Sequence, residues 1–376
     1  MNSSCDTVLF VSAFSYLGGA QISLGTVIKN LDGEFRAVVA APAEGGLLDQ
    51  IASAECLAGR ITIPGLGRRG TLRARVRIAA ILGRWLLRNR RSLVAIHVNG
   101  DSELKLILPL VPFIRVPIIV WHHRAQLPET TTNLRRLWRS IARKTVWVAV
   151  SEARRAELEQ AGVASPANLT VIPNPIDPVD VVPAARHHPS ENIVIGYLGC
   201  EYVDKGFLLL PAVARQVQDL PVTILCVTKG VPRAANSAAI NDAMDQLRGL
   251  TGTVSFRPRT FTVRDIYAET DVVIVPSRAE SFCRIAAEAM LNGQPVIASD
   301  LPALRELVGN GAGMLFTEGD ADEAAAAIRT LASDPDLVGQ LGQEGRRRAE
   351  AFKPDRVVAA LERLYRLDIP IDLQDH

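Results

Sequence analysis

The stretch from Asp271 to Glu306 constrains the fold of this 376-residue chain more than any other part of its sequence. It begins with a short apolar run, Val272 to Val275, which is typical of a fully buried strand. An alanine-rich segment follows and ends at Asn292-Gly293, a usual stop for a helix. A second apolar run, Val296 to Ser299, completes a strand–helix–strand unit. Such a unit predicts a parallel sheet.

Two carboxylates lie within this unit, Glu280 in the loop after the first strand and Glu288 about one turn into the helix. Ligands of open parallel sheets bind outside the C-terminal ends of the strands, and the free N–H groups of a helix start attract phosphate. A diphosphate on the amides near Ser281 to Arg284 would leave one carboxylate toward each end of a nucleotide sugar, where it can accept hydroxyl donors. Taken as an isolated pair, the two glutamates are better explained as a loop charge and a solvated helix charge.

Other predicted strand ends carry further candidate contacts. Gly18-Gly19 separates a strand from a helix, and paired glycines let the backbone approach a ligand, although a plain turn is the alternative. His122-His123 ends a strand, and only one of two adjacent side chains can point into a site from extended backbone; the alternative is a histidine satisfied by backbone groups. Gly199 and Lys205 follow a strand in the second half of the chain. The alternative for Lys205 is an ordinary surface lysine.

Short apolar runs predict the remaining strands, and amphipathic segments predict helices. The predicted strands cover 7–13, 36–41, 61–63, 93–98, 116–121, 146–150, 193–198, 223–227, 254–256 and 313–316. Residues 68–91 and 352–367 are predicted helices. Asp320 and Asp334 each open a formal Asp-x-Asp pattern, but both precede helical segments and are interpreted as caps rather than metal ligands.

The opening stretch resembles the signature of retaining, GT-B-fold glycosyltransferases of family 4 (glycosyl transferases group 1). Its pattern is roughly P-S-x-x-E-x-F-G-x-x-x-x-E-A-M-x-x-G-x-P-V, and this chain matches it at Pro276, Ser277, Glu280, Phe282, Glu288, Ala289, Met290, Gly293, Pro295 and Val296. It departs at Cys283, where glycine is usual, and at Pro302-Ala303, where paired glycines are common.

Shorter motifs extend the resemblance to the rest of the chain, more loosely in the first half. Gly18-Gly19-Ala20, Ser151-Glu152 and the segment from Val171 to Asp177 are similar to family patterns there. In the second half, Gly199, Lys205 and Gly206 match the pattern G-R-L-x-x-x-K-G, with Cys200 where arginine is usual.

The resemblance implies an α/β protein with the GT-B fold, in which two Rossmann-like, doubly wound parallel-sheet domains face each other across a cleft. Residues 1–175 would form the N-terminal acceptor-binding domain and residues 190–350 the nucleotide-sugar-binding domain. Residues 351–376 would form a helix that crosses back to the first domain, and residues 174–191, rich in proline, would be the linker.

The resemblance also implies the roles of single residues in a sugar transfer that retains the anomeric configuration. Glu288 would hold the ribose hydroxyls of the donor, and Glu280 would hold the hydroxyls of its sugar. His123, with His122 close behind, would approach that sugar, and Gly18 with Gly19 would face the donor phosphate or the acceptor. Gly199 would open the donor loop. Lys205, with the amides near Ser281, Phe282 and Cys283, would neutralise the leaving diphosphate, and Arg284 is a conjectured replacement for the arginine missing at Cys200.

The donor would be a nucleotide sugar such as a UDP- or GDP-sugar, and the resemblance calls for no cofactor and no metal. The acceptor would be a glycan or a lipid-linked molecule in the synthesis of a cell-surface or secreted glycan. Two alternatives stay open at this point: a non-catalytic, decayed GT-B protein that binds a sugar nucleotide or glycan, and a GT-B nucleotide-sugar epimerase.

Charge and composition bear on partners and location. Residues 1–185 hold 22 basic and 14 acidic residues, and the remainder holds 20 and 26, so the first half is basic. Nine arginines lie within residues 68–91. This segment is predicted to be an outer amphipathic helix with a solvated face, or a helix that binds an anionic membrane surface. No aromatic residues alternate with the arginines, which argues against nucleic acid. The five cysteines show no Cys-x-x-Cys spacing, and the sequence shows no signal peptide and no membrane span. These features predict a cytoplasmic protein, which could bind peripherally to the inner face of the plasma membrane.

Overall fold

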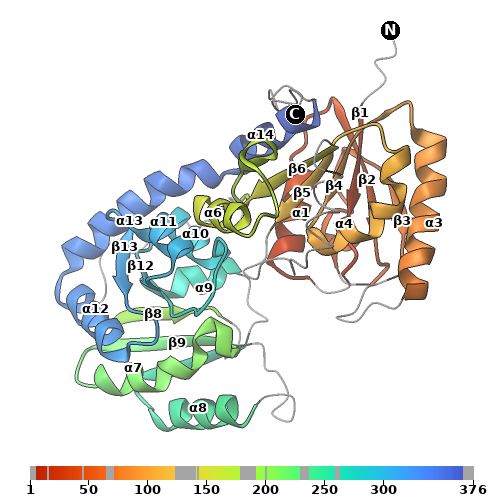
Figure 1. Cartoon of the computed structure of the whole chain (residues 1–376). Helices are drawn as coiled ribbons and strands as arrows, with labels where there is room; N and C mark the ends of the chain where they lie inside the picture. The colour runs from red at the N-terminus through yellow and green to blue at the C-terminus, as the bar shows by residue number, and fades with distance from the viewer. Residues whose placement is uncertain are drawn as a thin grey trace. The chain divides into compact units, whose positions relative to one another are not determined.

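The computed structural model divides into two compact units, one of residues Met1–Pro175 with Pro354–His376 and one of Ile176–Lys353 (Figure 1). The structure describes residues 6–14, 17–44, 46–64, 72–122, 141, 144–177, 192–199, 201–228, 237–258 and 263–366. His123, Cys200 and most of the predicted linker therefore lie outside the described residues, as does the side chain of His122.

The first unit is built on a seven-stranded sheet in the order β3-β2-β1-β4-β5-β6-β7, and every paired neighbour is parallel. Its strands are β1 Asp6–Val11, β2 Phe35–Ala41, β3 Leu57–Thr62, β4 Leu93–Val98, β5 Ile118–His122, β6 Thr145–Ala149 and β7 Leu169–Val171. Its helices are α1 Gly19–Lys29, α2 Leu47–Gln50, α3 Leu72–Asn89, α4 Asp101–Ile107, α6 Glu152–Gln160 and α14 Pro354–Tyr365, with 3₁₀ turns η1 Leu108–Phe113 and η3 Pro166–Asn168.

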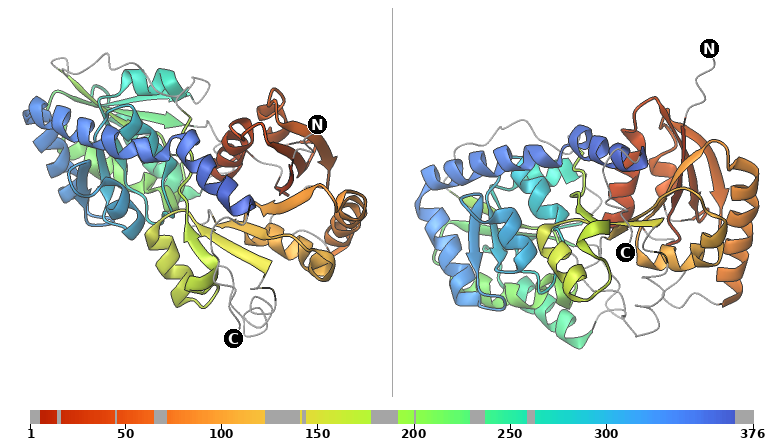
Figure 2. Two further views of the ribbon diagram at one scale, coloured as in Figure 1. Left: turned by 90° about the horizontal axis from the view of Figure 1, so that it is seen from above. Right: turned by 45° about the horizontal axis from the view of Figure 1, so that its top comes forward.

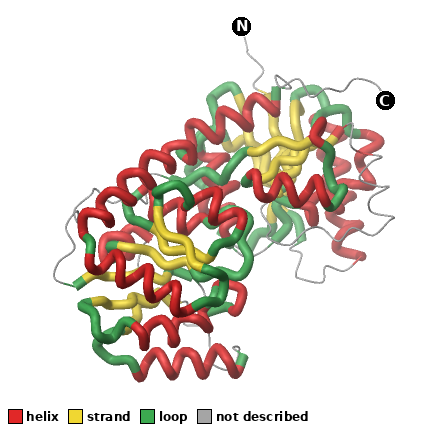
Figure 3. The backbone as a smooth tube through the Cα atoms, turned by 60° about the vertical axis from the view of Figure 1, so that its left-hand side comes forward, coloured by secondary structure: helices red, strands yellow, loops and turns green. Residues whose placement is uncertain are grey.

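The central strands of this sheet are apolar on both faces, because helices cover both faces (Figure 3). Val8, Leu9, Phe10 and Val11 of β1 are all fully buried. The strand predictions for this half are confirmed apart from their ends, and β7 is an addition that the sequence analysis did not predict.

The C-terminal helix α14 belongs to the first unit and packs beside α1, as Figure 2 shows with α14 in blue and α1 in red. The carboxylate of Glu362 accepts a hydrogen bond of 2.6 Å from the backbone N–H of Asp32. The hydroxyl of Tyr365 lies 2.7 Å from Nδ1 of His97 in the core. The last described helix is therefore anchored by one buried and one partly buried polar contact as well as by apolar packing.

The second unit is built on a six-stranded parallel sheet in the order β10-β9-β8-β11-β12-β13. Its strands are β8 Ile193–Tyr197, β9 Val222–Thr228, β10 Val254–Pro258, β11 Val272–Val275, β12 Val296–Ser299 and β13 Gly313–Phe316. Its helices are α7 Leu210–Gln216, α8 Ala238–Gly249, α9 Val263–Glu269, α10 Arg284–Leu291, α11 Pro302–Val308, α12 Ala321–Ser333 and α13 Pro335–Ala349, with 3₁₀ turns η5 Val203–Lys205, η6 Phe207–Leu209 and η8 Glu350–Phe352.

The strand–helix–strand unit predicted from the sequence is β11–α10–β12, with β11 and β12 paired in parallel. Gly206 has a left-handed backbone that separates η5 from η6, and α7 begins directly after η6. Asp320 and Asp334 cap α12 and α13 with their carboxylates, as predicted. Within the described ranges, no helix is both long enough and apolar enough to cross a bilayer.

Candidate active site

The strand order of the second sheet places one pair of loops at its switch point. From β8 the chain moves outward through β9 and β10, then returns to continue on the other side with β11, β12 and β13. Loops that leave neighbouring strands in opposite directions open a crevice at their C-terminal ends, where ligands of such sheets bind. The loop after β8 carries Gly199 and Lys205, and the loop after β11 carries Glu280 to Cys283. The predicted donor residues of this unit therefore come from the two strands that flank the switch point.

Glu280 and Lys205 form an ion pair across these two loops. Nζ of Lys205 lies 2.6 Å from Oε1 of Glu280, and Oγ of Ser277 donates a second hydrogen bond of 2.9 Å to the same oxygen. The Glu280 side chain is only 10% exposed, whereas that of Lys205 is 38% exposed. The carboxylate is thus fixed and largely desolvated, while the ammonium group still reaches solvent.

The loop that carries Lys205 is held against the end of β11 by a glycine and by backbone contacts. Gly206 has φ of +70°, and a Cβ there would lie 1.7 Å from the carbonyl oxygen of Pro276. The N–H of Arg278 donates to the carbonyl of Asp204 at 2.9 Å, and the hydroxyl of Tyr197 donates to the carbonyl of Lys205 at 3.2 Å. Only glycine fits this approach, so Gly206 sets the position of the lysine beside it.

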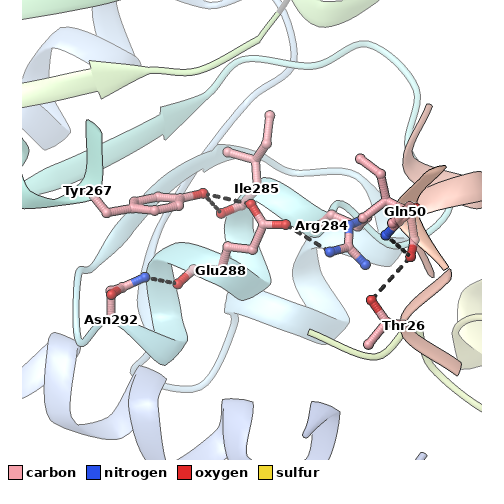
Figure 4. A network of polar contacts seen from close by, with 8 residues as sticks. Thr26, Gln50, Tyr267, Arg284, Ile285, Glu288 and Asn292 are labelled. Carbon is pink, nitrogen blue, oxygen red and sulfur yellow. Dashed lines mark hydrogen bonds and ion pairs between the residues drawn. The ribbon is translucent and has the colours of Figure 1, made fainter. Parts of the chain in front are cut away.

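Glu288 is buried in α10 and receives hydrogen bonds on both carboxylate oxygens (Figure 4). Nη2 of Arg284 lies 3.1 Å from Oε1, and the hydroxyl of Tyr267 lies 3.1 Å from Oε2 and 3.2 Å from the carbonyl oxygen of Ile285. Burial, together with the neighbouring Glu288 carboxylate, raises the pKa of Tyr267 well above its usual value, so the phenol keeps its proton and donates. These contacts fix the rotamer of the carboxylate.

Cys283 occupies an unusual backbone position at the start of α10. It is the N-cap residue and has φ of +72°, a left-handed conformation that non-glycine residues rarely adopt. This explains physically why glycine is usual at this position in the signature. Its side chain is buried, and burial with the nearby Glu280 raises the pKa of the thiol, which is therefore protonated at neutral pH.

Ser281 and Phe282 are also buried, and the ring of Phe282 packs edge-on against Phe352 with 5.2 Å between centroids. The aromatic side chain serves the core of the unit, so Phe282 can contact a ligand through its backbone. Gly199, Lys205, Glu280 and Cys283 line one small cavity of about 20 Å³. The structure thus brings together most of the second-unit residues that the sequence analysis selected, with Glu288 one helical turn away in α10.

The candidate residues of the first unit are less completely described. Gly18 and Gly19 start α1 after β1, at the β1–β4 switch point of the first sheet. The N–H of Gly18 donates to the side chain of Gln21 at 3.2 Å, and its φ of −112° is open to any residue. His122 ends β5, with its side chain outside the described residues, and His123 lies outside them altogether.

Sequence reasoning missed several buried polar residues that support these loops. Tyr267 orients Glu288, and Ser277 and Tyr197 orient Glu280 and the backbone at Lys205; no periodic pattern marks them. In the first unit, Asn99 and Glu103 are buried after β4. Glu103 accepts from the N–H of Ala13 at 3.3 Å, and Asn99 donates to the carbonyl of Ala20 at 3.3 Å. The sequence signal that could have identified Asn99 is its place as a polar residue immediately after the buried strand β4.

Two curated proteins with similar sequences are named as glycosyltransferases. The D-inositol 3-phosphate glycosyltransferase of Kineococcus radiotolerans is 29% identical over 244 residues, covering 58% of this chain and 56% of the relative. The MMP alpha-(1->4)-mannosyltransferase of Mycolicibacterium hassiacum is 30% identical over 227 residues, covering 58% and 53%. The chain therefore matches about half the length of these relatives.

Solved structures match over almost the whole chain. Anabaena HepE, in complex with UDP and glucose, superposes with a TM-score of 0.76 at 22% identity, covering 94% of this chain and 98% of that one. A glycosyltransferase from Rickettsia africae superposes with a TM-score of 0.81 at 16% identity, covering 96% and 98%. At these identities the likeness establishes the fold, which is GT-B with two Rossmann-like parallel-sheet domains.

Two family models match successive parts of the sequence. The model described as Glycosyltransferase Family 4 matches residues 17–180, and the model described as Glycosyl transferases group 1 matches residues 192–334. The second match contains the loops of Lys205 and Glu280 and the helix of Glu288. The chain belongs to glycosyltransferase family 4.

Proposed function

We propose that this protein transfers a sugar from a nucleotide diphosphate sugar to an acceptor hydroxyl and retains the anomeric configuration. The bond between the anomeric carbon and the diphosphate oxygen breaks, and a bond to the acceptor oxygen forms. The acceptor's proton leaves with the departing diphosphate. The observation that carries the proposal is the Lys205–Glu280 pair at the switch point of the second sheet, with Glu288 one turn into the following helix.

Each residue has a part that its surroundings support. Glu288, held by Tyr267 and Arg284, would accept the ribose hydroxyls of the donor, since each carboxylate oxygen can accept more than one hydrogen bond. Lys205 and Ser277 both contact Oε1 of Glu280, so its other oxygen, Oε2, would accept hydroxyls of the donor sugar. Lys205 and the amides near Phe282 and Cys283 would neutralise the charge that develops on the diphosphate, which is usually the largest catalytic term.

The finer assignments are supported by the ligand of one solved relative and by the basic charge of the first half. UDP-sugars are the first donors to test, because Anabaena HepE was solved with UDP and glucose. His122, His123, Gly18 and Gly19 would contact the donor sugar or the acceptor. We assign the acceptor to the glycan or lipid-linked class used for surface or secreted polysaccharide, handled at the inner face of the membrane, to which the arginine-rich segment 68–91 would bind.

A ligand panel read by thermal unfolding and by turnover tests the proposal. UDP, GDP and ADP, with their sugar conjugates, are added in EDTA and again with magnesium. A ligand that binds only the folded state stabilises it by about 2.7 kcal/mol at 100 times its dissociation constant. We expect one nucleotide class to raise the melting temperature in EDTA and its labelled sugar conjugate to be consumed. If no nucleotide shifts the melting temperature and no labelled donor is consumed, the transferase assignment is wrong.

A further inference from the structure

A cavity of about 690 Å³ opens on the first unit, away from the strand ends that carry the candidate site. Its walls come from the C-terminal half of α3 and from η1 with the residues that follow it. β4 starts beside it at Leu93 and β5 at Ile118, so the cavity lies at the N-terminal edge of the sheet, whereas ligands of parallel sheets bind at the other edge. Its volume is within the range of roughly 300–1,000 Å³ that small-molecule pockets have.

The rim of this cavity exposes large apolar side chains. Leu87 on α3 is 68% exposed, and Phe113 at the end of η1 is 77% exposed. Nζ of Lys144 donates to the carbonyl oxygens of Val111 and Ile114, at 3.2 and 2.9 Å, which fixes the turn that presents Phe113. Exposed apolar residues gathered around a hollow are typical of a binding surface.

Positive charge surrounds the same rim. Arg90, Arg91 and Arg115 line the cavity and are exposed. The chain has seven arginines and no acidic residue from Leu72 to Asn99. Arg73, Arg77, Arg84 and Arg88, all exposed, fall on one face of α3 by their spacing, opposite the buried Ile78 and Leu82. Long cationic side chains and an exposed aromatic residue together suit the interface of an anionic membrane.

We propose that this cavity takes an acyl chain of an anionic phospholipid, with the lipid phosphate held by Arg90, Arg91 and Arg115 and α3 lying along the membrane surface. A soluble polyanion would satisfy the arginines but not the exposed Leu87 and Phe113. An apolar peptide would suit the cavity but not the charge around it. The inference rests on the membrane partner proposed above and does not depend on sugar transfer.

Vesicle co-sedimentation with the full chain tests the inference. The probes are vesicles of phosphatidylcholine and vesicles of phosphatidylcholine with about one-third phosphatidylglycerol. We expect binding to the anionic vesicles only. R90E/R91E/R115E should lose it by more than about 100-fold, since each arginine near such a surface is worth roughly five-fold. The matched control is R248E/R346E/R356E, which has the same net charge and changes three exposed arginines elsewhere; it should bind within a few-fold of the parent.

The apolar part of the site needs its own variant, L87S/F113S. Both side chains are exposed, so melting temperatures should stay near that of the parent. We expect this variant to bind the anionic vesicles more weakly and to be released by moderate salt, while the parent stays bound. Equal binding of the parent to both vesicle types, equal losses in the two triple variants, or unchanged binding of L87S/F113S would overturn the inference. Donor hydrolysis measured on the same variants should be unchanged, which separates failure here from failure of the proposed function.

Discussion

The amine of Lys205 lies 2.6 Å from Oε1 of Glu280, although 75 positions separate the two residues in the sequence. The loops after β8 and β11 bring them together at the switch point of the second sheet. The pair places one cation beside one carboxylate in a crevice where a diphosphate and a sugar would lie next to each other. Its location, rather than its contribution to stability, points to function.

We expect Lys205→Met and Glu280→Gln each to lower turnover of labelled donor on the order of 10²-fold or more, because each removes a group aimed at developing charge or at the donor sugar. Stability should change by about 1 kcal/mol or less in Glu280→Gln, because Lys205 is 38% exposed and solvent screens its charge. Lys205→Met should cost somewhat more, roughly 1–3 kcal/mol, because the 10% exposed Glu280 carboxylate loses its cation. The matched control is Arg305→Met, which breaks a more exposed ion pair with Asp300 in the same unit. Near-parental turnover in both site variants would exclude this site.

Tyr267→Phe should weaken donor binding while leaving the chemical step within a few-fold. The substitution removes only the hydroxyl that lies 3.1 Å from Oε2 of Glu288. A hydrogen bond to a charged group contributes roughly 1.5–3 kcal/mol, so KM for the donor should rise about 10-fold or more. Tyr202→Phe, on an exposed tyrosine of the same unit, is the control. A fall in kcat with unchanged KM would contradict the role of Tyr267 in orienting Glu288.

The sequence was sufficient to predict the elements that follow from local pattern. The apolar runs at 272–275 and 296–299 became β11 and β12 with the predicted bounds, because a strand buried on both faces needs an uninterrupted apolar run. β7, a three-residue strand from Leu169 to Val171, was missed, although runs of the same length at 61–63 and 254–256 were predicted as strands. The candidate residues themselves were selected by resemblance to a signature whose order is preserved in the chain.

What the sequence could not supply was contact between distant segments. Nothing in the local sequence of Tyr267 predicts that its hydroxyl meets Glu288, 21 positions later, because that depends on how α9 and α10 pack. The left-handed backbone of Cys283 is also set by the loop around it and not by the residue. Gly206 shows the same dependence, since the carbonyl that excludes a side chain there belongs to Pro276.

Gly206→Ala should destabilise the second unit strongly. The new Cβ would lie 1.7 Å from the carbonyl oxygen of Pro276, and the residue would also have to keep φ of +70°. Gly252→Ala is a matched control, since Gly252 has φ of +94° but no atom within 4 Å of an added Cβ. We expect about 1 kcal/mol of loss in the control from backbone strain alone, and clearly more, on the order of 3 kcal/mol, in Gly206→Ala. Equal losses in urea unfolding would show that the loop moves freely away from β11.

Acid should destabilise the first unit through His97. Burial lowers the pKa of His97 to about 3, below its ordinary value of 6.5. Between these two values the unfolded chain binds a proton that the folded chain does not, so the free energy of unfolding falls as the pH drops below about 6.5. From pH 7.5 to pH 5.0 this group should account for a loss on the order of 2 kcal/mol.

Urea unfolding of the parent and of His97→Gln at pH 7.5 and pH 5.0 measures this loss. The variant loses the contact with Tyr365 at both pH values and should therefore be less stable throughout. Its loss of stability between the two pH values should be smaller than that of the parent by about 2 kcal/mol. An equal pH dependence in both proteins would mean that His97 does not stay neutral in the fold.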